Sequence, residues 1–580
     1  MARPANRRGE KILSTNLTHY QKAKETHHME MLLSLAVYMS HIIMIFTGFI
    51  IVFNTFLSLR KNVTKEKVRI MLFNKTTKEK IPIKYWENSI GRSGYSDVIL
   101  QDSAVSRNHG VLFRREDGWL IADTGSKSGI KVNGKQIKES TKLHIGDTMQ
   151  MGFSELSLEK TSQDMQNSAT CKKGDKEPIL IPAGVILFII TIFTFLMAAE
   201  TCVQEGNIDI ESFFPVILIN LVAWICFIVN KYIFKRVNFE LENLGVFLTG
   251  ISVVIAGSVN IRQAYIQIVS LAIGMVFFNI LLFLLKNPNK AMKLRPYVAA
   301  FAIIILLANL IFGKIKHGAQ NWIMIGPFSV QPSEIVKVLF ILFGTATLEH
   351  LQTTKNLTEF IIFAGICIGF LCFMGDFGTA LIFFAAFILV AFMRSGSFRT
   401  ILSICFSAFL GAIIILKFKP YIANRFSAWR NVWAHINDIG YQQTRVLIYA
   451  ASGGLLGVGI GKGYLRYVFG AANDLVFGML CEEFGLIFAL LIIFCFVLLT
   501  AYARKTSIKS RSAFYAIAAN VSAGMLLFQA ALNVFGAVDI LPLTGVNLPF
   551  VSMGGTSIIS SWGLLALIKA ADERTFAARR

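Results

Sequence analysis

One long polar segment, from Lys417 to Gly485, interrupts the apolar sequence of this chain and contains side chains that could carry chemistry. It leads to an isolated carboxylate, Asp474, at the point where the sequence becomes apolar again. A carboxylate within hydrogen-bond reach of an alcohol can act as a general base, and an ionisable group at such a boundary is a candidate functional residue. The alternative is structural, because an Asp before an apolar run commonly caps a helix.

The same segment is rich in basic side chains that could stabilise an anionic ligand or leaving group. They are Arg425, Arg430, Arg445, Lys462 and Arg466. Each alone could equally be a solvated charge or face lipid headgroups, whereas together they would favour anions. The glycine-rich run 457–463 has neither a preceding strand nor Walker spacing, so we expect it to let the loop approach the membrane surface rather than to cradle a phosphate.

Further charged residues lie beside other apolar runs. Glu334 and Lys337 are three residues apart and share one helix face. Neither is expected to face lipid, because charges at membrane depth seek partners. They could pair with each other, with Glu482 or with Asp376. Such a polar cluster could support a cavity or be purely structural.

The elements that must position these residues follow from composition. A chain of 580 residues that is 54% hydrophobic and 16% charged indicates a polytopic membrane protein with a smaller soluble part. A spanning helix needs about 20 mainly apolar residues. The candidate spans are 31–57, 179–199, 213–234, 241–260, 264–285, 297–313, 333–349, 358–374, 377–393, 400–416, 475–502, 512–536 and 549–570.

Lys and Arg collect in short loops such as 231–236, 286–295 and 503–511, so the net charge of +22 does not indicate nucleic-acid binding. The positive-inside rule puts these loops in the cytoplasm. Segments 314–332 and 417–474 are then both external, as an external active site would require. The eight cysteines show no metal spacing, and no structural disulfide is expected.

Residues 67–160 differ in kind, because they are polar, rich in turns and contain short alternating runs that predict a β-sandwich. They include Gly91-Arg92-Ser93, Ser106-Arg107-Asn108-His109 and the run GSKSGIKVNG at 125–134. In the order and spacing of these motifs the stretch resembles the forkhead-associated (FHA) domain.

The resemblance implies a phosphothreonine site at one end of the sandwich, because Arg and hydroxyl donors satisfy a phosphate. It would be formed by Arg92, Ser93, Ser106 and Arg107, with Ser128 where the family usually has an Asn. His109 would brace the loops instead. The alternative is a degenerate sandwich that serves only as a spacer.

Four more stretches carry a second resemblance. They are GAQNWIMIGPFSVQPSEIVK at 318–337, MGDFGTALI at 374–382, the polar segment with Asp474 and Glu482-Glu483, and NVFGAVDILPLTGVNLPFVSMGGTS at 533–557. In family order, they resemble the SEDS family (shape, elongation, division, sporulation), the FtsW/RodA/SpoVE-type proteins. The match over 241–572 implies a core of about ten helices, so about three helices are additions.

This resemblance implies a peptidoglycan glycosyltransferase that polymerises lipid II, with Asp474 as the essential catalytic carboxylate. Its implied substrate and diphosphate contacts are Arg425, Arg430, Arg445, Lys462 and Trp322, supported by the polar cluster Glu334, Lys337, Asp376 and Glu482. A divalent cation, Mg²⁺ or Mn²⁺, bridging Asp474 and the diphosphate would suit the chemistry, but the sequence has no dedicated ligand cluster.

The predicted organisation is a basic tail (1–30), a transmembrane helix (31–57), a cytoplasmic FHA domain (67–160), a linker (161–178), two extra transmembrane helices (179–234) and the SEDS core (241–572). The implied location is the bacterial cytoplasmic membrane, with the catalytic loop outside. The implied partners are lipid II, membrane lipids, a class B penicillin-binding transpeptidase and a threonine-phosphorylated protein. The alternatives are a flippase for lipid-linked precursor and a non-catalytic FHA scaffold.

Overall fold

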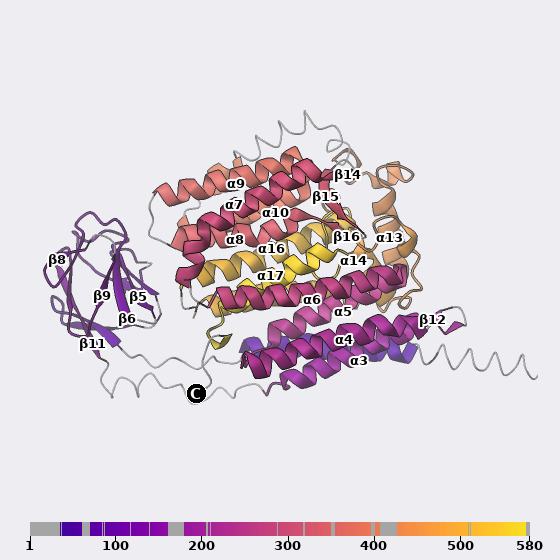
Figure 1. The fold of residues 1–580 in the computed structure, drawn as a ribbon, viewed down its shortest axis with the longest axis horizontal. Coiled ribbons are helices and arrows are strands. Elements are labelled where there is room, and N and C mark those ends of the chain that lie inside the picture. Colours follow the sequence, from indigo (N-terminus) through magenta and orange to yellow (C-terminus); the bar gives the residue numbers. More distant parts are fainter. Residues whose placement is uncertain are drawn as a thin grey trace, which may run out of the picture.

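The computed structural model describes residues 35, 38–60, 70–160, 179–316, 319–349, 354–395, 401–406 and 426–575, apart from 84, 86, 95, 116–117, 138–139, 205–206, 209, 287, 327, 509 and 511. It contains a bundle of long helices lying roughly side by side and a sandwich of short strands at one end of that bundle (Figure 1). The predicted combination of a polytopic helical protein and a small all-β domain is confirmed.

Eight helical stretches in the described part of the chain are long and apolar enough to cross a membrane. They are Tyr38–Arg60, α3 (Ala183–Cys202), Ile210–Ile233 with α4 (Phe213–Ile228), α5 (Glu240–Val259), α6 (Ile261–Leu284), Lys293–Phe312 in α7 (Pro288–Phe312), α15 (Leu486–Ser507) and α16 (Ala513–Ala537). The bundle also contains α8 (Pro332–Glu349), α9 (Thr354–Phe373), α10 (Phe377–Ser395) and α17 (Gly555–Ala570). Most of the predicted span 400–416 lies outside the described residues.

Small residues allow the central helices to approach closely, as is typical of membrane bundles. Trp562 on α17 is 1% exposed and packs against glycines of α5 and α6. A Cβ at Gly245 would lie 3.0 Å from this indole, and a Cβ at Gly274 would lie 3.2 Å from it. The two glycines therefore make room for one large aromatic side chain at the centre of the bundle.

The predicted span 475–502 is wrong as a single helix. The chain forms the short helix α14 (Val476–Met479) and a π-helical turn, η5 (Leu480–Phe484), before α15 begins at Leu486. Gly485 separates them with φ of 86°, a conformation that favours glycine. The apolar periodicity continues across this break, which is why the sequence reads as one span.

The sandwich consists of two antiparallel-rich sheets with strand orders β2-β1-β11-β10-β7-β8 and β4-β3-β5-β6-β9. The strands are β1 (Ile70–Asn74), β2 (Glu79–Pro82), β3 (Glu87–Gly91), β4 (Val98–Ile99), β5 (Gly110–Arg115), β6 (Gly118–Asp123), β7 (Ile130–Val132), β8 (Lys135–Gln136), β9 (Ser140–Leu143), β10 (Thr148–Met151) and β11 (Ser154–Lys160). Alternate aliphatic side chains, such as Leu72, Leu112 and Leu156, form its core.

The end of the bundle far from the sandwich carries short elements (Figure 1). They are β14 (Lys314–Lys316), β15 (Ala319–Ile325), β16 (Phe328–Val330), α13 (Tyr441–Gly453) and α14. Apart from α14, these elements belong to the two segments predicted to share one membrane face, 314–332 and 417–474. The candidate site lies among them.

Candidate active site

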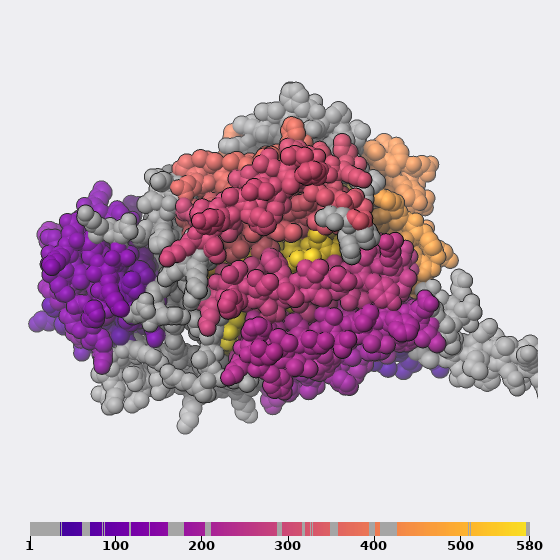
Figure 2. Space-filling model, in the orientation of Figure 1, coloured from indigo at the N-terminus to yellow at the C-terminus, as the bar shows by residue number. Residues whose placement is uncertain are grey.

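A cavity of about 1720 Å³ opens between α6, α8, α9, α10 and the loops that carry the short elements. Its apolar wall includes Ile266, Ile361, Leu381 and Phe384. Figure 2 shows the C-terminal part of the chain, in yellow, at the bottom of a recess beside α6. The cavity therefore combines an apolar wall with the polar residues described below.

Asp474 lines this cavity and is half-buried. Its carbonyl accepts a hydrogen bond from Asn533 Nδ2 (2.9 Å), and its N–H donates to Gly470 O (2.9 Å). A Cβ at Gly545 would lie 3.4 Å from Asp474 Oδ2, so the absence of a side chain there keeps one side of the carboxylate open. Helix α14 begins only at Val476, with Leu475 at the N-cap position and no side-chain capping bond. Asp474 therefore lies one residue before the N-cap position of α14.

The C-terminal motif, residues 533–557, holds the segment around Asp474 in place. Ser552 Oγ donates to Asn473 O (2.6 Å), and Met553 N donates to Ala472 O (2.8 Å). Asn533 also donates to Val546 O (2.8 Å). These bonds explain why residues 533–557 and the segment around Asp474, far apart in sequence, form one wall of the cavity.

Asp376 lies in the same cavity at the start of α10 and is 8% exposed. Its Oδ2 accepts from Asn321 Nδ2 and from Gln331 Nε2, both at 3.1 Å. Its Oδ1 accepts from the backbone N–H of Thr379 (3.2 Å), so Asp376 also caps α10. Trp322 lines the cavity from β15, next to Asn321. Asn321, beside Trp322, is thus a hydrogen-bond donor to Asp376.

Glu334 and Lys337 line the cavity from α8 and pair with each other (2.8 Å). Lys337 Nζ also donates to Gln529 Oε1 (2.8 Å), and Ser560 Oγ donates to Glu334 Oε2 (2.5 Å). A buried ion pair needs such additional bonds, because desolvation offsets much of its Coulomb attraction. The pair therefore links α8, α16 and α17 at the wall of the cavity.

Glu482 lies elsewhere. Its carboxylate accepts from the backbone N–H groups of Tyr464 (2.7 Å) and Leu465 (2.9 Å). The neighbouring Glu483 accepts from Gly461 N (3.1 Å). The glycine-rich run and the two residues after it, Tyr464 and Leu465, thus donate backbone N–H groups to two carboxylates of the protein itself.

The basic residues are dispersed. Arg466 lines the cavity, whereas Arg430, Arg445 and Lys462 are not among its lining residues, and Arg425 lies outside the described residues. The guanidinium of Arg430 lies over Trp429 (5.5 Å), and that of Arg445 lies over Tyr441 (5.1 Å). Among the described members of this set, Arg466 is therefore the one placed to meet a ligand in the cavity.

Several amide side chains that position the site were not predicted from the sequence. Gln529 and Asn533 are four residues apart on α16, and they bind Lys337 and the Asp474 backbone. On α13, Gln442 donates to Phe469 O (2.8 Å) and Gln443 donates to Gly536 O (3.0 Å). Two amides at i and i+4 within an apolar helix were the available signal for the first pair.

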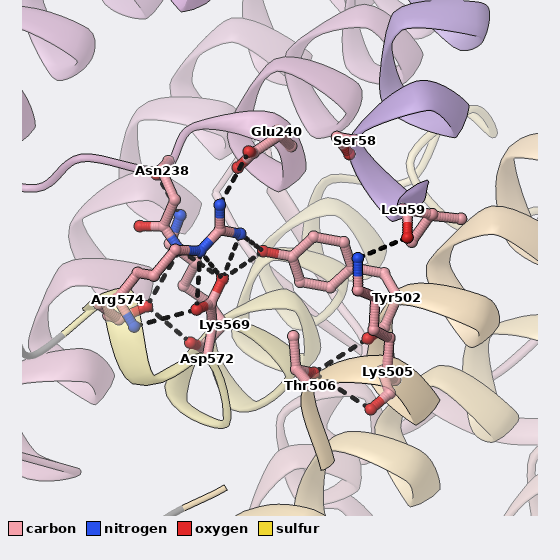
Figure 3. A network of polar contacts seen from close by, with 12 residues as sticks. Ser58, Leu59, Asn238, Glu240, Tyr502, Lys505, Thr506, Lys569, Asp572 and Arg574 are labelled. Atoms are coloured by element: carbon pink, nitrogen blue, oxygen red, sulfur yellow. Dashed lines mark hydrogen bonds and ion pairs between the residues drawn. The ribbon is translucent and has the colours of Figure 1, made fainter. Parts of the chain in front are cut away.

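At the opposite end of the bundle, a polar network ties the end of α17 and the residues that follow it, Asp572 and Arg574, to the core (Figure 3). Asp572 accepts from Asn238 Nδ2 (2.6 Å), Tyr502 Oη (2.5 Å) and Arg574 (2.7 Å). Burial alone would raise the pKa of Asp572, but the hydrogen bonds and positive charge of Arg574, together with Tyr502, lower it to about 2. Lys569 pairs with Glu242 beside this group (2.8 Å).

The sandwich gathers its candidate phosphate-binding residues at one end. Arg92 N donates to Ser106 O (3.0 Å), and Ser93 N donates to Arg107 O (3.1 Å). A Cβ at Gly91 would lie 2.2 Å from Arg107 O, so glycine is required where these loops meet. The side chains of Arg92 and Arg107 are exposed. Two guanidinium groups at this loop junction are suited to binding a phosphate.

His109 and Ser128 serve this end of the sandwich differently. His109 is fully buried, accepts from Ser106 N at Nδ1 (3.0 Å) and donates from Nε2 to Gly129 O (3.1 Å). It therefore braces two loops, as the resemblance implies. Ser128 is exposed and its Oγ donates to Ala104 O (3.1 Å), so its hydroxyl also has a structural use.

The fold and the cavity define a multi-pass helical membrane protein with a carboxylate-bearing cavity at one end and a β-sandwich at the other. The FtsW/RodA/SpoVE cell cycle protein family matches residues 241–576, and the FHA domain family matches residues 88–152. The chain therefore belongs to the FtsW/RodA/SpoVE family and carries an FHA domain. Both predicted resemblances are confirmed.

Two curated relatives agree with this assignment. A probable peptidoglycan glycosyltransferase FtsW of Coxiella burnetii is 32% identical over 277 residues, which cover 45% of this chain and 73% of the relative. The corresponding FtsW of Saccharophagus degradans is 29% identical over 360 residues, covering 58% and 92%. A chain of a solved peptidoglycan synthase complex aligns over 57% of this chain and 96% of its own length, with 23% identity and a TM-score of 0.48.

Proposed function

We propose that the chain is a peptidoglycan glycosyltransferase that polymerises lipid II at the outer face of the bacterial cytoplasmic membrane. Lipid II is a disaccharide-pentapeptide on a polyprenyl diphosphate. The observation that carries the proposal is the position of Asp474, whose carboxylate lines a large cavity together with Arg466, Trp322 and apolar walls. The names of the relatives point to the same activity.

Asp474 acts as the general base in this proposal. Its carboxylate takes the proton of the 4-hydroxyl of the acceptor GlcNAc while that oxygen bonds to the anomeric carbon of the donor. The bond between the anomeric carbon and the diphosphate breaks, and the electron pair leaves with the diphosphate. Anchoring of the Asp474 backbone by Asn533 fixes the base, which favours catalysis by reducing the cost of orientation.

Arg466 stabilises the departing diphosphate. Its Nε is buried and has no hydrogen-bond partner among the described residues, and it belongs to a residue that lines the cavity. A cation beside a developing anion stabilises the transition state. The apolar wall on α6, α9 and α10 offers a surface for the polyprenyl chain.

A divalent cation is not given a step in this mechanism. Among the described residues, no three His, Cys, Asp or Glu side chains gather closely enough to hold a metal ion. The donor set therefore does not match a dedicated metal site.

A flippase is the second candidate, because the buried polar groups Glu334, Lys337 and Asp376 also suit a transport path. Asp474→Ala separates the two functions in vesicles that contain labelled lipid II. We expect this variant to lose glycan strands, whereas a flippase would keep transporting precursor and would never form strands. Asp438→Asn is the matched control, since Asp438 is an exposed carboxylate of the same segment and does not line the cavity.

We further propose that the FHA domain faces the cytoplasm and binds a phosphothreonine. The sandwich lies at the opposite end of the bundle from the short elements around the cavity, which supports opposite sides of the membrane for the two sites (Figure 1). Glu87, on the strand that leads into Arg92, accepts a hydrogen bond from Ala513 N at the start of α16 (2.8 Å). Since α16 also carries Asn533, this contact offers one route from the domain to Asp474.

Phosphopeptide binding is tested with the full-length protein and a phosphothreonine peptide. We expect Arg92→Ala to abolish binding, while Lys142→Ala, on β9 beside the β5–β6 turn, leaves it intact. Absence of phosphopeptide binding by the wild-type protein would support the spacer alternative, and binding retained by Arg92→Ala would contradict the assigned role of Arg92. A non-catalytic scaffold would instead tolerate Asp474→Asn in cells and fail with Arg92→Ala.

Family membership also motivates a partner. We propose a class B penicillin-binding transpeptidase that cross-links the glycan and activates its synthesis, in addition to the phosphorylated protein bound by the FHA domain. Co-purification of such a transpeptidase with the wild-type chain, and faster polymerisation in its presence, would support this assignment.

A further inference from the structure

The two helices that flank the FHA domain in sequence meet again at the far end of the bundle. Helix Tyr38–Arg60 precedes the sandwich and α3 follows it, and neither belongs to the family-matched segment 241–576. His41, near the start of the first helix, and Glu200, near the end of α3, form a buried pair of 2.9 Å. Their side chains are 7% and 1% exposed. A buried charge pair at this point requires an explanation, because desolvation makes it costly.

The His41–Glu200 pair binds the backbone of residues 454–463, which we call the glycine loop. His41 Nε2 lies 2.6 Å from Leu456 O, and Glu200 Oε2 accepts from Ile460 N (3.4 Å). Both ring nitrogens of His41 thus face acceptors, so the arrangement is complete when the ring donates from both nitrogens. Ser40 Oγ also donates to Glu200 (3.2 Å). The additional helices therefore bind the backbone of the catalytic domain itself.

The other side of the glycine loop rests on η5. Val458 N donates to Glu482 O (2.9 Å), and Gly459 N donates to Glu483 O (3.1 Å). A Cβ at Gly457 would lie 2.3 Å from the carbonyl oxygen of Glu483, so the two backbones are in direct contact. The loop is consequently held between η5 of the family core and the His41–Glu200 pair of the added helices.

The glycine loop ends three residues before Arg466, the arginine that lines the cavity. Leu465 N is bound by Glu482, and the following residue is Arg466, which lines the cavity. The Arg466 guanidinium lies over the Tyr467 ring (4.8 Å) and donates to Tyr467 Oη (2.7 Å). A displacement of the loop would move this guanidinium relative to Asp474, and an error of about 1 Å can cost up to about 100-fold in rate.

We infer that His41 and Glu200 are positioning residues that hold the glycine loop, and through it Arg466, in the geometry that stabilises the leaving diphosphate. This inference rests on the proposed glycosyl transfer and assigns a role to helices that the family segment lacks. In sequence, the two helices that carry the pair lie on either side of the FHA domain.

Two substitutions of His41 separate its contacts. The amide of Gln occupies the place of Nε2 and can donate to Leu456 O, whereas the amide of Asn occupies the place of Nδ1 and can reach only Glu200. In the full-length protein, we expect His41→Asn and His41→Ala to accelerate hydrogen exchange of the amides of residues 458–465, and His41→Gln to leave it near the wild-type rate. Thr55→Val is the control, since Thr55 Oγ1 bonds only within the same helix, to Ile51 O.

Activity with labelled lipid II supplies the second readout. We expect His41→Ala to lower kcat by about tenfold and His41→Gln to restore most of it. In an Arg466→Ala background, His41→Ala should cost little more, because both changes remove the same contribution. Unchanged hydrogen exchange in His41→Ala, or a full additional loss in the double variant, would overturn the inference. If the exchange changes as expected but wild-type protein makes no glycan, the proposed function fails while the positioning of the loop stands.

Discussion

The two ends of the helical bundle each contain an aspartate, Asp572 at one end and Asp474 at the other, but the surroundings of the two carboxylates differ. Asp572 is 3% exposed, is enclosed by Asn238, Tyr502 and Arg574, and has its charge compensated. Asp474 is half-buried and lines a cavity of about 1720 Å³. The comparison teaches that an enclosed, compensated carboxylate contributes to stability, whereas a carboxylate anchored through its backbone and open to a cavity is available for chemistry.

The largest expected effect concerns the cavity carboxylate. Asp474→Asn should lower glycan synthesis by at least about 1000-fold, because the amide cannot take the proton of the acceptor hydroxyl. The unfolding midpoint should fall less than it does for Asp572→Asn, since the bonds with Asn533 and Gly470 use the Asp474 backbone and survive the substitution. Thermal unfolding in detergent checks the second part, and a large loss of stability would mean that Asp474 is structural like Asp572.

An intermediate case is the Glu334–Lys337 pair, which is enclosed yet lines the cavity. Lys337→Met should cost about 3 kcal/mol, because Glu334 is left buried without its cation. The double variant Glu334→Gln/Lys337→Met should recover at least half of this loss. Denaturant unfolding of the two variants measures the difference, and equal losses would exclude a simple ion-pair role.

Asp572→Asn should reduce stability by about 2 kcal/mol at neutral pH and leave the activity per folded molecule unchanged. The folded-state pKa of Asp572 is lowered to about 2, below its ordinary value. Its stabilisation is therefore present above about pH 4 and is lost as the pH falls from about 4 towards 2. Unfolding midpoints measured across this range should fall more steeply for wild type than for the variant. Parallel curves would contradict the assigned role.

The smallest effect is expected in the sandwich. Ser128→Asn restores the residue that the FHA family usually has, and one added hydrogen bond of about 1 kcal/mol would tighten phosphopeptide binding by about fivefold. Isothermal titration with a phosphothreonine peptide checks this change. Weaker binding would indicate that the bond from Ser128 to Ala104 O matters more for the loop than the ligand contact does.

Much of this architecture could be predicted from the sequence, because apolar runs and alternating strands are local signals. The break at Gly485 could not, since the hydrophobic pattern continues on both sides of it. The predicted grouping of Glu482 with Glu334, Lys337 and Asp376 differs from its observed contacts for a similar reason. Its partners are backbone N–H groups of Tyr464 and Leu465, and a sequence pattern shows only side chains.

The candidate site was also predictable only in part. The sequence motifs predict Asp474, Asp376, Trp322 and the Glu334–Lys337 pair as site residues, and all of them line one cavity. The anchors Gln529 and Asn533 depend on contacts between distant segments, which helical spacing alone does not reveal. The same holds for His41 and Glu200, which are 159 residues apart.

Glycan synthesis by the purified full-length protein tests the central claim most directly. Labelled lipid II in lipid vesicles, with and without the transpeptidase, would be followed by separation of the products by length. The account predicts strands from wild type and from Asp438→Asn, and none from Asp474→Asn at equal amounts of folded protein. Strands of wild-type length from Asp474→Asn would contradict it.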